Sequence, residues 1–305
     1  MTTIKANGQE IELSNPDKEM FPGEKIIKKD LVEYYHKISG YMLPLMKDRP
    51  VMLHRYPNGI GDKDFYQKEE PGYFPGWIDT ITVKVKKEGQ DTQKFVNCNS
   101  EAALVYIANQ ATITPHIWLS KKDNLGHPDK MIYDLDPPEG EFEVVRECAK
   151  DFKALFDKLD LNAFLMTTGS KGLHVVLPMD GSADFEQVRQ FAKDVAGLLS
   201  DREPEKYTTE TLKEKRKGRL FLDYLRNSYG QTSVAPYSLR ARKGAPVATP
   251  IDWNELGSGE LDSRTYTYGN IFRRLANKQD PWKDFEKNKN NLKKARKKLD
   301  RMIEK

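Results

Sequence analysis

The chain has 305 residues, of which 38% are hydrophobic and 31% are charged. This composition is typical of a folded globular protein, and the length suits one large domain or two smaller ones. The sequence contains no apolar run near the roughly 18 residues that span a bilayer and begins without the apolar core of a signal peptide. Two cysteines, Cys98 and Cys148, argue against a disulfide framework and a cysteine-rich zinc site, so we expect a reducing intracellular compartment.

The net charge of +4 is unevenly distributed along the chain. Residues 283–305 contain ten Lys or Arg and four Asp or Glu. This segment therefore carries a balance of +6, which leaves −2 for the rest of the chain. Two further basic patches are KEKRKGR at 213–219 and EKIIKKD at 24–30. Each basic stretch is either a phosphate-binding surface or a solvated face.

The front part of the chain predicts an α/β module. Residues 1–15 read as a short hairpin around an Asn-Gly turn, and residues 51–96 alternate β-type segments with Gly and Pro turns. Residues 101–111 have the pattern of a helix. An earlier helix begins at Asp30 and has an apolar face formed by Leu31, Tyr34, Tyr35, Ile38 and Tyr41.

The middle part predicts a ferredoxin-like, or RRM-like, βαββαβ unit within an α+β fold. Pro137 and Pro138 end its first strand, because proline cannot continue a sheet. A Gly-Ser-Lys-Gly turn joins the second and third strands, and Asp184 with Gln187 caps the second helix. The six elements are expected at 130–136, 141–159, 163–168, 173–178, 184–199 and 219–225.

This topology places four polar side chains on one sheet surface. The first strand lies between the third and the fourth, so Asp134 and Asp136 come close to His174 and Asp223. The two-residue period of a strand puts Asp134 and Asp136 on the same face. Like charges so close together are tolerated only in water or around a cation. The pattern is either a polar strand end or a site for two hard divalent cations with Asp223 as a further ligand.

The turn TTGSKGLH (167–174) brings two glycines, hydroxyl groups and Lys171 beside these carboxylates. Exposed amides and a lysine suit a triphosphate, although the spacing is not that of a Walker A loop, and an ordinary hairpin turn is the alternative. Phe65 and Tyr66, with Lys68, form either a base-stacking surface or part of the core. The histidine and cysteine spacings do not support zinc, and no nucleophile signature is present.

Several long motifs resemble the polymerase domain of bacterial ligase D, a member of the archaeo-eukaryotic primase superfamily. They run from about residue 10 to residue 280 and are NPDKEMFP, RPVMLHRYPNGI, DFYQK, TPHIW, DLDP, TTGSKGLH and FLDYLRNSYGQTSVAPYSLRARKGAPVATP. The resemblance implies a primer- and template-dependent nucleotidyltransferase, a DNA polymerase and primase-polymerase of DNA repair. It implies a preference for ribonucleotides and a role in gap filling and end extension during non-homologous end joining. It also implies a two-metal site that uses divalent cations, Mn²⁺ in preference or Mg²⁺.

The resemblance also implies roles for individual residues. The metal ligands and catalytic residues would be Asp134, Asp136 and Asp223. The incoming nucleotide would be bound by His116, Thr168, Lys171, His174 and Arg240. DNA would be bound by Lys18, Lys28, Phe65, Tyr66, Lys68 and Arg216. Within this last set, the two N-terminal lysines would receive the downstream 5′-phosphate, the aromatic pair would stack at the template side, and Arg216 would lie on a mobile loop near the active site.

Three positions differ from the family pattern or leave the match open. The family usually has Ser where Thr168 stands, so the hydroxyl is kept and only its fine positioning changes. His54 occupies a position often held by lysine, which weakens a phosphate-binding role there. The lysine matched to Lys28 is alternatively Lys25 or Lys29, because this segment is shorter here.

The expected partners are gapped or 3′-overhang DNA ends with a 5′-phosphate, nucleoside triphosphates, Ku and a DNA ligase, in a prokaryotic cytoplasm at the nucleoid. No K-x-D-G ligase motif is present, so we expect a free-standing polymerase or an excised domain. We expect an N-terminal module at 1–125, a catalytic core at 126–280 and a basic helical tail at 281–305, in one compact unit.

Three other functions share some of these features. A primase that starts chains de novo would use the same metal site. A non-catalytic module that bridges DNA ends would not need the three aspartates. A metal-dependent nuclease would not need a turn that binds a triphosphate.

Overall fold

The computed structural model describes residues 2–87, 90–138 and 142–304 and divides into two compact units. Unit 1 consists of Met1–Leu125, Thr232–Ala248 and Tyr266–Arg273. Unit 2 consists of Gly126–Gln231, Thr249–Thr265 and Arg274–Lys305. The chain therefore crosses between the units five times. The sequence had suggested continuous ranges, 126–280 and 281–305, for the part of the chain after residue 125.

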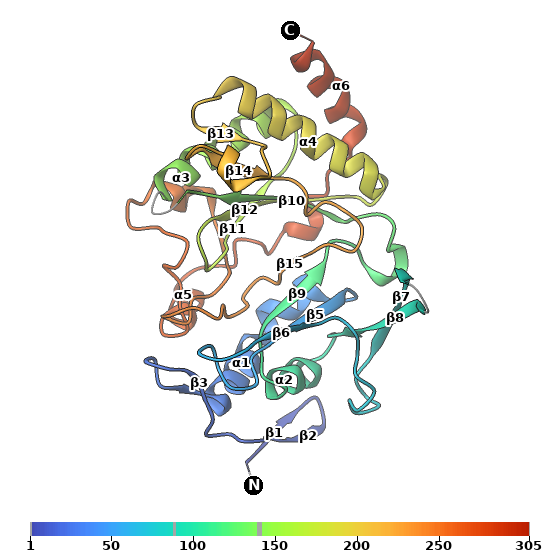
Figure 1. The fold of residues 1–305 in the computed structure, drawn as a ribbon, viewed down its shortest axis with the longest axis vertical. Helices are drawn as coiled ribbons and strands as arrows, with labels where there is room; N and C mark the ends of the chain where they lie inside the picture. The colour runs from blue at the N-terminus through green and yellow to red at the C-terminus, as the bar shows by residue number, and fades with distance from the viewer. Residues whose placement is uncertain (1, 88–89, 139–141, 305) are drawn as a thin grey trace. The chain divides into compact units, whose positions relative to one another are not determined.

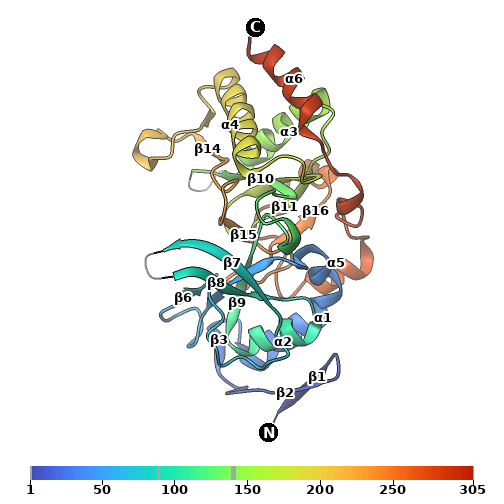
Figure 2. The same ribbon diagram turned by 90° about the vertical axis from the view of Figure 1, so that its right-hand side faces the viewer.

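Unit 1 is built on an antiparallel sheet with the strand order β15-β9-β5-β8-β7, and β6 pairs with the free part of β5 (Figure 1). The helices α1 and α2 pack against each other, and α2 contacts β9. Figure 2 shows the β7–β8 hairpin extending from this sheet. The elements are β1 (Thr3–Ala6), β2 (Gln9–Glu12), β3 (Glu19–Phe21), β4 (Ile26–Ile27), α1 (Lys28–Met46), β5 (Pro50–Arg55), β6 (Phe65–Gln67), β7 (Thr80–Lys87), β8 (Gln90–Asn97), α2 (Glu101–Asn109), β9 (Thr112–Trp118) and β15 (Thr232–Val234).

Helix α1 begins at Lys28, two residues before the predicted start, because the Asp30 carboxylate accepts a hydrogen bond from the Ile27 amide and caps the first turn. Most of the predicted apolar face is buried. Tyr41 is an exception: it is 36% exposed, and Met42 takes its place in the core. Both residues follow the helical period, so the sequence pattern alone did not separate them.

Unit 2 contains a six-stranded sheet with the order β13-β14-β10-β12-β11-β16. The strands β14-β10-β12-β11 are the fourth, first, third and second of the predicted unit, all antiparallel, which confirms the ferredoxin-like arrangement. The short strands β13 and β16 at the two edges were not predicted. The elements are β10 (Lys130–Asp136), α3 (Phe142–Lys158), β11 (Phe164–Thr167), β12 (Leu173–Pro178), α4 (Phe185–Arg202), β13 (Tyr207–Thr208), β14 (Leu220–Asp223), β16 (Thr249–Ile251) and α6 (Leu292–Ile303).

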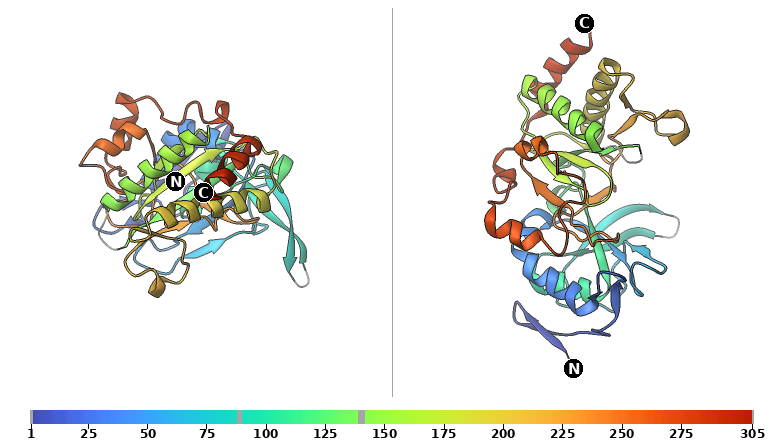
Figure 3. Two further views of the ribbon diagram at one scale, coloured as in Figure 1. Left: turned by 90° about the horizontal axis from the view of Figure 1, so that it is seen from above. Right: turned by 90° about the vertical axis from the view of Figure 1, so that its left-hand side faces the viewer.

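Both long helices of unit 2 lie on the same side of its sheet (Figure 3). Tyr133 of β10 points to this side, because its ring lies 4.6 Å from the ring of Phe152 and 5.8 Å from that of Phe156 on α3. Successive residues of a strand alternate between faces. Asp134 and Asp136 therefore lie on the face that the helices leave uncovered. The start of the predicted helix at residue 141 lies outside the described residues.

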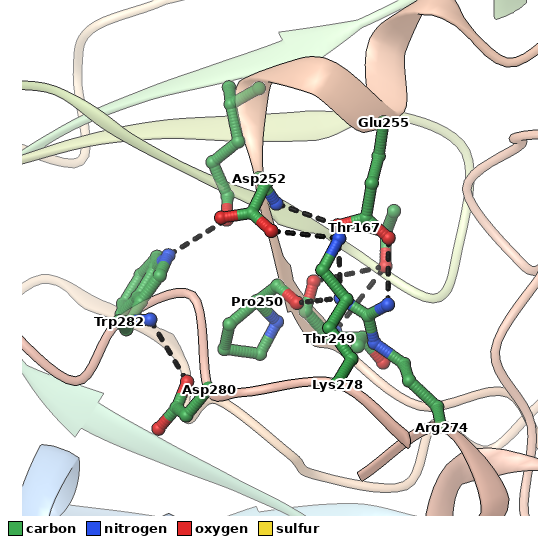
Figure 4. Close-up of polar contacts among 10 residues, drawn as sticks. Thr167, Thr249, Pro250, Asp252, Glu255, Arg274, Lys278, Asp280 and Trp282 are labelled. Carbon is green, nitrogen blue, oxygen red and sulfur yellow. Dashed lines mark hydrogen bonds and ion pairs between the residues drawn. The ribbon is translucent and has the colours of Figure 1, made fainter.

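A partly buried polar network lies at the β16 edge of this sheet (Figure 4). Arg274, at the junction of the units on α5 (Ile271–Asn277), pairs with Glu255 at 2.7 Å and donates to the carbonyl of Pro250 at 2.9 Å. The indole of Trp282 donates to the carbonyl of Leu165 at 2.8 Å. These contacts tie the segment after α5 to β11 and β16. None of the helices within 2–87, 90–138 and 142–304 has the length and hydropathy that a bilayer span requires.

Candidate active site

The strand register of unit 2 aligns the predicted carboxylates with the predicted histidine. Asp134 on β10 is directly opposite His174 on β12 and directly opposite Asp223 on β14. Residues opposite each other on neighbouring strands point to the same face. Asp136 lies two residues along β10 and shares that face. The structure therefore brings all four side chains to the face of the sheet that α3 and α4 do not cover.

Asp134 is the most enclosed carboxylate of this group, with a side chain that is 16% exposed. Burial acts to raise its pKa, but the nearby His174 imidazole and the Arg226 guanidinium outweigh this and lower the pKa well below its usual range. The imidazole Nε2 lies 3.5 Å from the carboxylate, and the Arg226 Nε donates to it at 2.8 Å. Asp134 is therefore held ionised.

Asp223 has the opposite electrostatic setting. Burial raises its pKa, and the negative charge of Asp134 adds to the effect, while the Leu225 amide donates to the Asp223 carboxylate at 2.8 Å and lowers the pKa in part. Asp136 is more open, with a side chain that is 44% exposed and 3.5 Å from the Arg216 guanidinium. A bound cation would relieve the repulsion at Asp223.

The donor set suits a hard divalent cation, because it consists of carboxylate oxygens at adjacent register positions. Within residues 2–87, 90–138 and 142–304, no group of three or more His, Cys, Asp or Glu side chains is arranged to hold a metal ion. Arginines neutralise the carboxylates instead, with Arg226 on Asp134 and Arg216 near Asp136. Burial is the main cause of the raised pKa of Asp223, and the negative charge of Asp134 adds to it. A divalent cation fits this chemistry.

The turn between β11 and β12 is closed by its own first hydroxyl. The Thr168 side chain donates to the carbonyl of Gly172 at 3.0 Å and accepts from the amides of Ser170 and Gly172 at 3.2 and 3.3 Å. Gly169 has a φ of +63°, which glycine adopts readily. Lys171 is exposed next to the buried glycine. Thr168 therefore shapes the turn, and Lys171 is the side chain that the turn presents.

His174 also offers a buried polar atom to a ligand. Its side chain is 4% exposed, and its Nε2 faces Asp134. Its Nδ1 is buried and has no hydrogen-bond partner among the residues that the structure describes. Buried polar groups normally form hydrogen bonds. The unpaired Nδ1 atom of His174, beside the turn between β11 and β12, therefore indicates a ligand as its missing partner.

In unit 1, the sheet places two histidines and an aromatic residue on one face. His54 on β5 lies opposite Tyr66 on β6, and His116 on β9 is opposite Met52, two residues from His54. The rings of His54 and Tyr66 stack at 3.9 Å, and that of His116 lies edge-on to Tyr66 at 5.9 Å. A hydrogen bond between the imidazole Nε2 and the Asp64 carboxylate holds His54 in place.

Arg240 belongs to a loop of unit 1 that α1 fixes in place. Tyr34 donates to the carbonyl of Tyr237 at 2.7 Å, and the Tyr35 hydroxyl accepts from the amide of Leu239 at 3.2 Å. The positive charge of Arg240 acts to lower the pKa of His54, although burial of the imidazole is the larger cause. Arg240 therefore lies within electrostatic range of the histidine face.

The two predicted phosphate-binding lysines lie close together in unit 1. The amide of Lys28 donates to the carbonyl of Lys18 at 2.8 Å. Lys28 is buried, and its ammonium donates a hydrogen bond to the carbonyl of Ser14 at 2.5 Å. Lys25 and Lys29 are exposed. Burial, followed by the charges of Lys18 and Arg55, lowers the pKa of Lys28 to about 8. A phosphate would stabilise the crowded positive charge.

The predicted aromatic pair is on the surface of unit 1. Phe65 is 45% exposed and Tyr66 is 54% exposed, so neither belongs to the core. The Arg55 guanidinium lies 5.3 Å from the centre of the Phe65 ring. A shallow hollow next to the pair is lined by Phe65, Tyr66, Gln67, Lys68, Glu69, Glu70, Pro71 and Gln93. The side chains are available to a planar ligand.

The family of LigD primase-polymerase domains has a sequence model that matches residues 27–282 of this chain. The chain belongs to the LigD primase-polymerase domain family. The multifunctional non-homologous end joining protein LigD of Mycolicibacterium smegmatis is 32% identical over 256 residues, covering 83% of this chain and 33% of that protein. The bifunctional non-homologous end joining protein LigD of Bacillus subtilis is 29% identical, covering 91% of this chain and 44% of that protein. The chain thus spans less than half of either relative.

A solved structure supports the same assignment. The polymerase domain from Mycobacterium tuberculosis ligase D, determined in complex with DNA, superposes with a TM-score of 0.84 and 30% identity. The match covers 92% of this chain and 99% of that one. The predicted primase-polymerase fold is therefore confirmed, and LigD primase-polymerase domains are nucleotidyltransferases.

Two residues next to the predicted carboxylates were not singled out in the sequence. Arg226 neutralises Asp134, and Asn227 hydrogen-bonds both the amide and the carbonyl of Ile132 on β10, at 2.8 and 2.7 Å. Both follow Asp223 within the DYLRNSYG segment. A cation three residues after a carboxylate was the available signal; the segment was quoted as part of a family motif, but neither residue was given a role.

Proposed function

We propose that this chain extends a primer 3′-hydroxyl on a DNA template with nucleoside triphosphates, ribonucleotides in preference, to fill gaps and extend ends in non-homologous end joining. The observation that carries the proposal is the register of Asp134 with both Asp223 and His174, beside the turn that presents Lys171. A nuclease would have little use for the turn, and an end-bridging module would have little use for enclosed carboxylates.

In the proposed reaction, the 3′-oxygen attacks the α-phosphorus in line, and the bond from that phosphorus to the pyrophosphate breaks. Asp134, Asp136 and Asp223 would hold two divalent cations, Mn²⁺ in preference or Mg²⁺. When bound, such cations lower the pKa of a hydroxyl nucleophile and neutralise charge on the leaving group. Lys171 binds the triphosphate, and the turn that Thr168 closes keeps it in position.

Four further residues would bind the substrates. His174 is proposed to donate from Nδ1 to the nucleotide, since this buried atom has no partner among the described residues. His116 and Arg240 of unit 1 contact the incoming nucleotide in this proposal. Arg216 would move from Asp136 to the DNA or the nucleotide when a cation takes its place.

The DNA would be bound at two places on unit 1. Phe65 and Tyr66 stack on template bases, with Lys68 on the backbone, because exposed rings provide sequence-independent stacking surfaces. Lys18 and Lys28 receive the downstream 5′-phosphate. Ku and a DNA ligase are the proposed partners, at the nucleoid in a prokaryotic cytoplasm, since the relatives are bacterial proteins named for end joining.

The test is extension of a gapped, 5′-phosphorylated duplex, with ribo- and deoxyribonucleotides compared in Mn²⁺ and in Mg²⁺. Asp134→Asn and Asp223→Asn should each lower the rate at least about 100-fold. Asp157→Asn is the matched control, because this exposed carboxylate pairs with Lys153 on the surface of α3. Extension by either active-site variant at the rate of the control would contradict the proposal. A reaction without primer separates extension from de novo priming.

A further inference from the structure

Helix α6 has two chemically different faces. Leu292, Ala295 and Leu299 are buried, and the helix packs against α4. Figures 1 and 3 place α6 on the side of α4 that is turned away from the sheet of unit 2. The carboxylates of the candidate active site lie on the opposite face of that sheet. Helix α6 is therefore separated from them by α4 and the sheet.

The cations of α6 differ in whether they are paired. Arg296 pairs with Asp194 of α4 at 2.5 Å, and Lys298 pairs with Asp160. Both side chains flank the buried face. The remaining four are exposed and form no ion pair with any residue that the structure describes; they are Lys293, Lys294, Lys297 and Arg301.

These four side chains form one surface. A helix turns about 100° per residue, which gathers them on the side directly opposite Leu292, Ala295 and Leu299. We call this surface the outer basic face. Lys297 is four residues from both Lys293 and Arg301, so like charges repel at helical neighbours. The nearest acidic residues are Asp300, which pairs with Arg296, and Glu304 at the C-cap, so this side of the helix carries more positive than negative charge.

The outer basic face also lies outside the residues that the family model matches. The family model ends at residue 282, whereas α6 begins at Leu292. The face contains only ammonium and guanidinium groups. It has no aromatic or amide side chain that would read bases, and such groups contact phosphates without regard to sequence.

We propose that the outer basic face of α6 binds the phosphate backbone of duplex DNA, as a contact additional to the active site. Cations four residues apart on a helix recur about every 6 Å, and duplex DNA carries one charge per about 1.7 Å of its axis. Several phosphates of a duplex therefore lie within reach of the outer basic face. The choice of DNA over an acidic protein rests on the proposed function, which already acts on DNA.

The experiment measures binding of the 305-residue chain to a blunt duplex of 40 base pairs by fluorescence anisotropy, from low to moderate salt. The test variant replaces Lys293, Lys294, Lys297 and Arg301 by Gln. The control variant replaces four lysines that pair with carboxylates in unit 2, Lys153, Lys206, Lys287 and Lys289, by Gln. Both variants lose the same formal charge, so a difference between them reports position rather than net charge.

The test variant should bind at least about tenfold more weakly than the control, and its salt slope should fall by about one to three, since each lost phosphate contact removes about 0.9. A Lys293→Arg, Lys294→Arg and Lys297→Arg variant should bind like the parent, because it keeps the three positive charges, and an unchanged thermal transition of the Gln variant excludes misfolding as the cause. Equal affinities of the test and control variants would overturn the proposal. So would tighter binding of the parent face to polyglutamate than to the duplex.

This measurement contains no nucleotide, no divalent metal and no extendable end. It gives the same answer whether or not the chain polymerises. Binding through α6 without primer extension would reject the proposed function alone, and extension without a difference between the two variants would reject the role of α6 alone.

Discussion

The side chain of Asn227 forms hydrogen bonds with the backbone of β10 beyond the point where β14 ends. Its side-chain amide is fully buried and contacts both the amide and the carbonyl of Ile132, as a neighbouring strand would. A third hydrogen bond runs to the carbonyl of Tyr224 at 2.8 Å. The residue therefore fixes β10 just before Asp134.

Replacing Asn227 by Ala should lower the free energy of unfolding by about 2–4 kcal/mol, because two buried backbone groups lose their partners. Urea denaturation measures this change. Asn254→Ala is the control, since this exposed side chain should change stability by less than about 0.5 kcal/mol. Equal effects of the two substitutions would show that Asn227 does not support β10.

The lowered pKa of Lys28 should make the binding of 5′-phosphorylated DNA depend on pH. Its pKa is lowered to about 8 by burial and by the charges of Lys18 and Arg55, so the free protein loses this ammonium charge above pH 8. A phosphate monoester is already dianionic at pH 7, because its second pKa is about 6. The preference for 5′-phosphorylated over 5′-hydroxyl gapped DNA should be large at pH 7 and much smaller at pH 9.5.

Anisotropy titrations with the two DNAs measure this preference. Lys28→Gln should abolish it at pH 7. Lys29→Gln is the matched control, because Lys29 is exposed and 3.9 Å from Glu33, and this variant should keep the preference. An unchanged preference at pH 9.5 would assign the 5′-phosphate to other residues.

The alignment of the aspartates with His174 was predictable, because the order of elements determines the strand order. The arginine partners were not. Arg226 contacts Asp134 from a turn that follows β14, and Arg216 contacts Asp136 from the loop that precedes β14. Contacts of this kind depend on loop conformation, for which hydrophobic periodicity contains no information.

At the scale of elements, the turn between β11 and β12 is held against β10. A Cβ atom added to Gly172 would lie 1.8 Å from the carbonyl oxygen of Leu135 and 3.3 Å from Pro137. Glycine is therefore required here for the close approach of two backbones. The turn that presents Lys171 and the strand that bears Asp134 and Asp136 are in direct contact.

Gly172→Ala should destabilise the protein by at least about 2 kcal/mol, since the added methyl group cannot fit without moving β10 or the turn. It should also lower primer extension more than its stability loss explains. Gly197→Ala, in α4, has no atom within 4 Å of the added Cβ and should raise stability by up to about 1 kcal/mol. Thermal unfolding and initial extension rates measure both effects. Normal extension by a folded Gly172→Ala protein would contradict this interpretation.

Helices and strands with a clear hydrophobic periodicity were easier to predict than very short strands. The helices α3 and α4 and the strands β10, β11, β12 and β14 follow clear periodicities. In contrast, β13, β15 and β16 have two or three residues each. Such strands form only because a longer neighbour offers backbone groups to pair with, and the local sequence does not indicate that neighbour.

At the scale of the whole molecule, unit 1 depends on residues far from its main segment. Strand β15 pairs with β9, the carbonyl of Tyr237 accepts from Tyr34, and the carbonyl of Leu239 accepts from Thr114 at 2.7 Å. Residues 1–125 alone would leave buried hydroxyl groups without acceptors and an open edge on β9.

The fragment 1–125 should therefore not fold cooperatively, although it contains nearly all strands and helices of unit 1. Dispersion in a ¹H–¹⁵N NMR spectrum and the shape of the thermal transition measure this. The full chain is the control. A dispersed spectrum and a sharp transition for the fragment would show that residues 232–248 and 266–273 are dispensable for unit 1.

The five crossings between the units also limit how such a protein can change during evolution. A single recombination event inside the gene would replace parts of both units at once, and the new parts would not match the old ones. New activities are therefore added more easily at the ends of the region than within it.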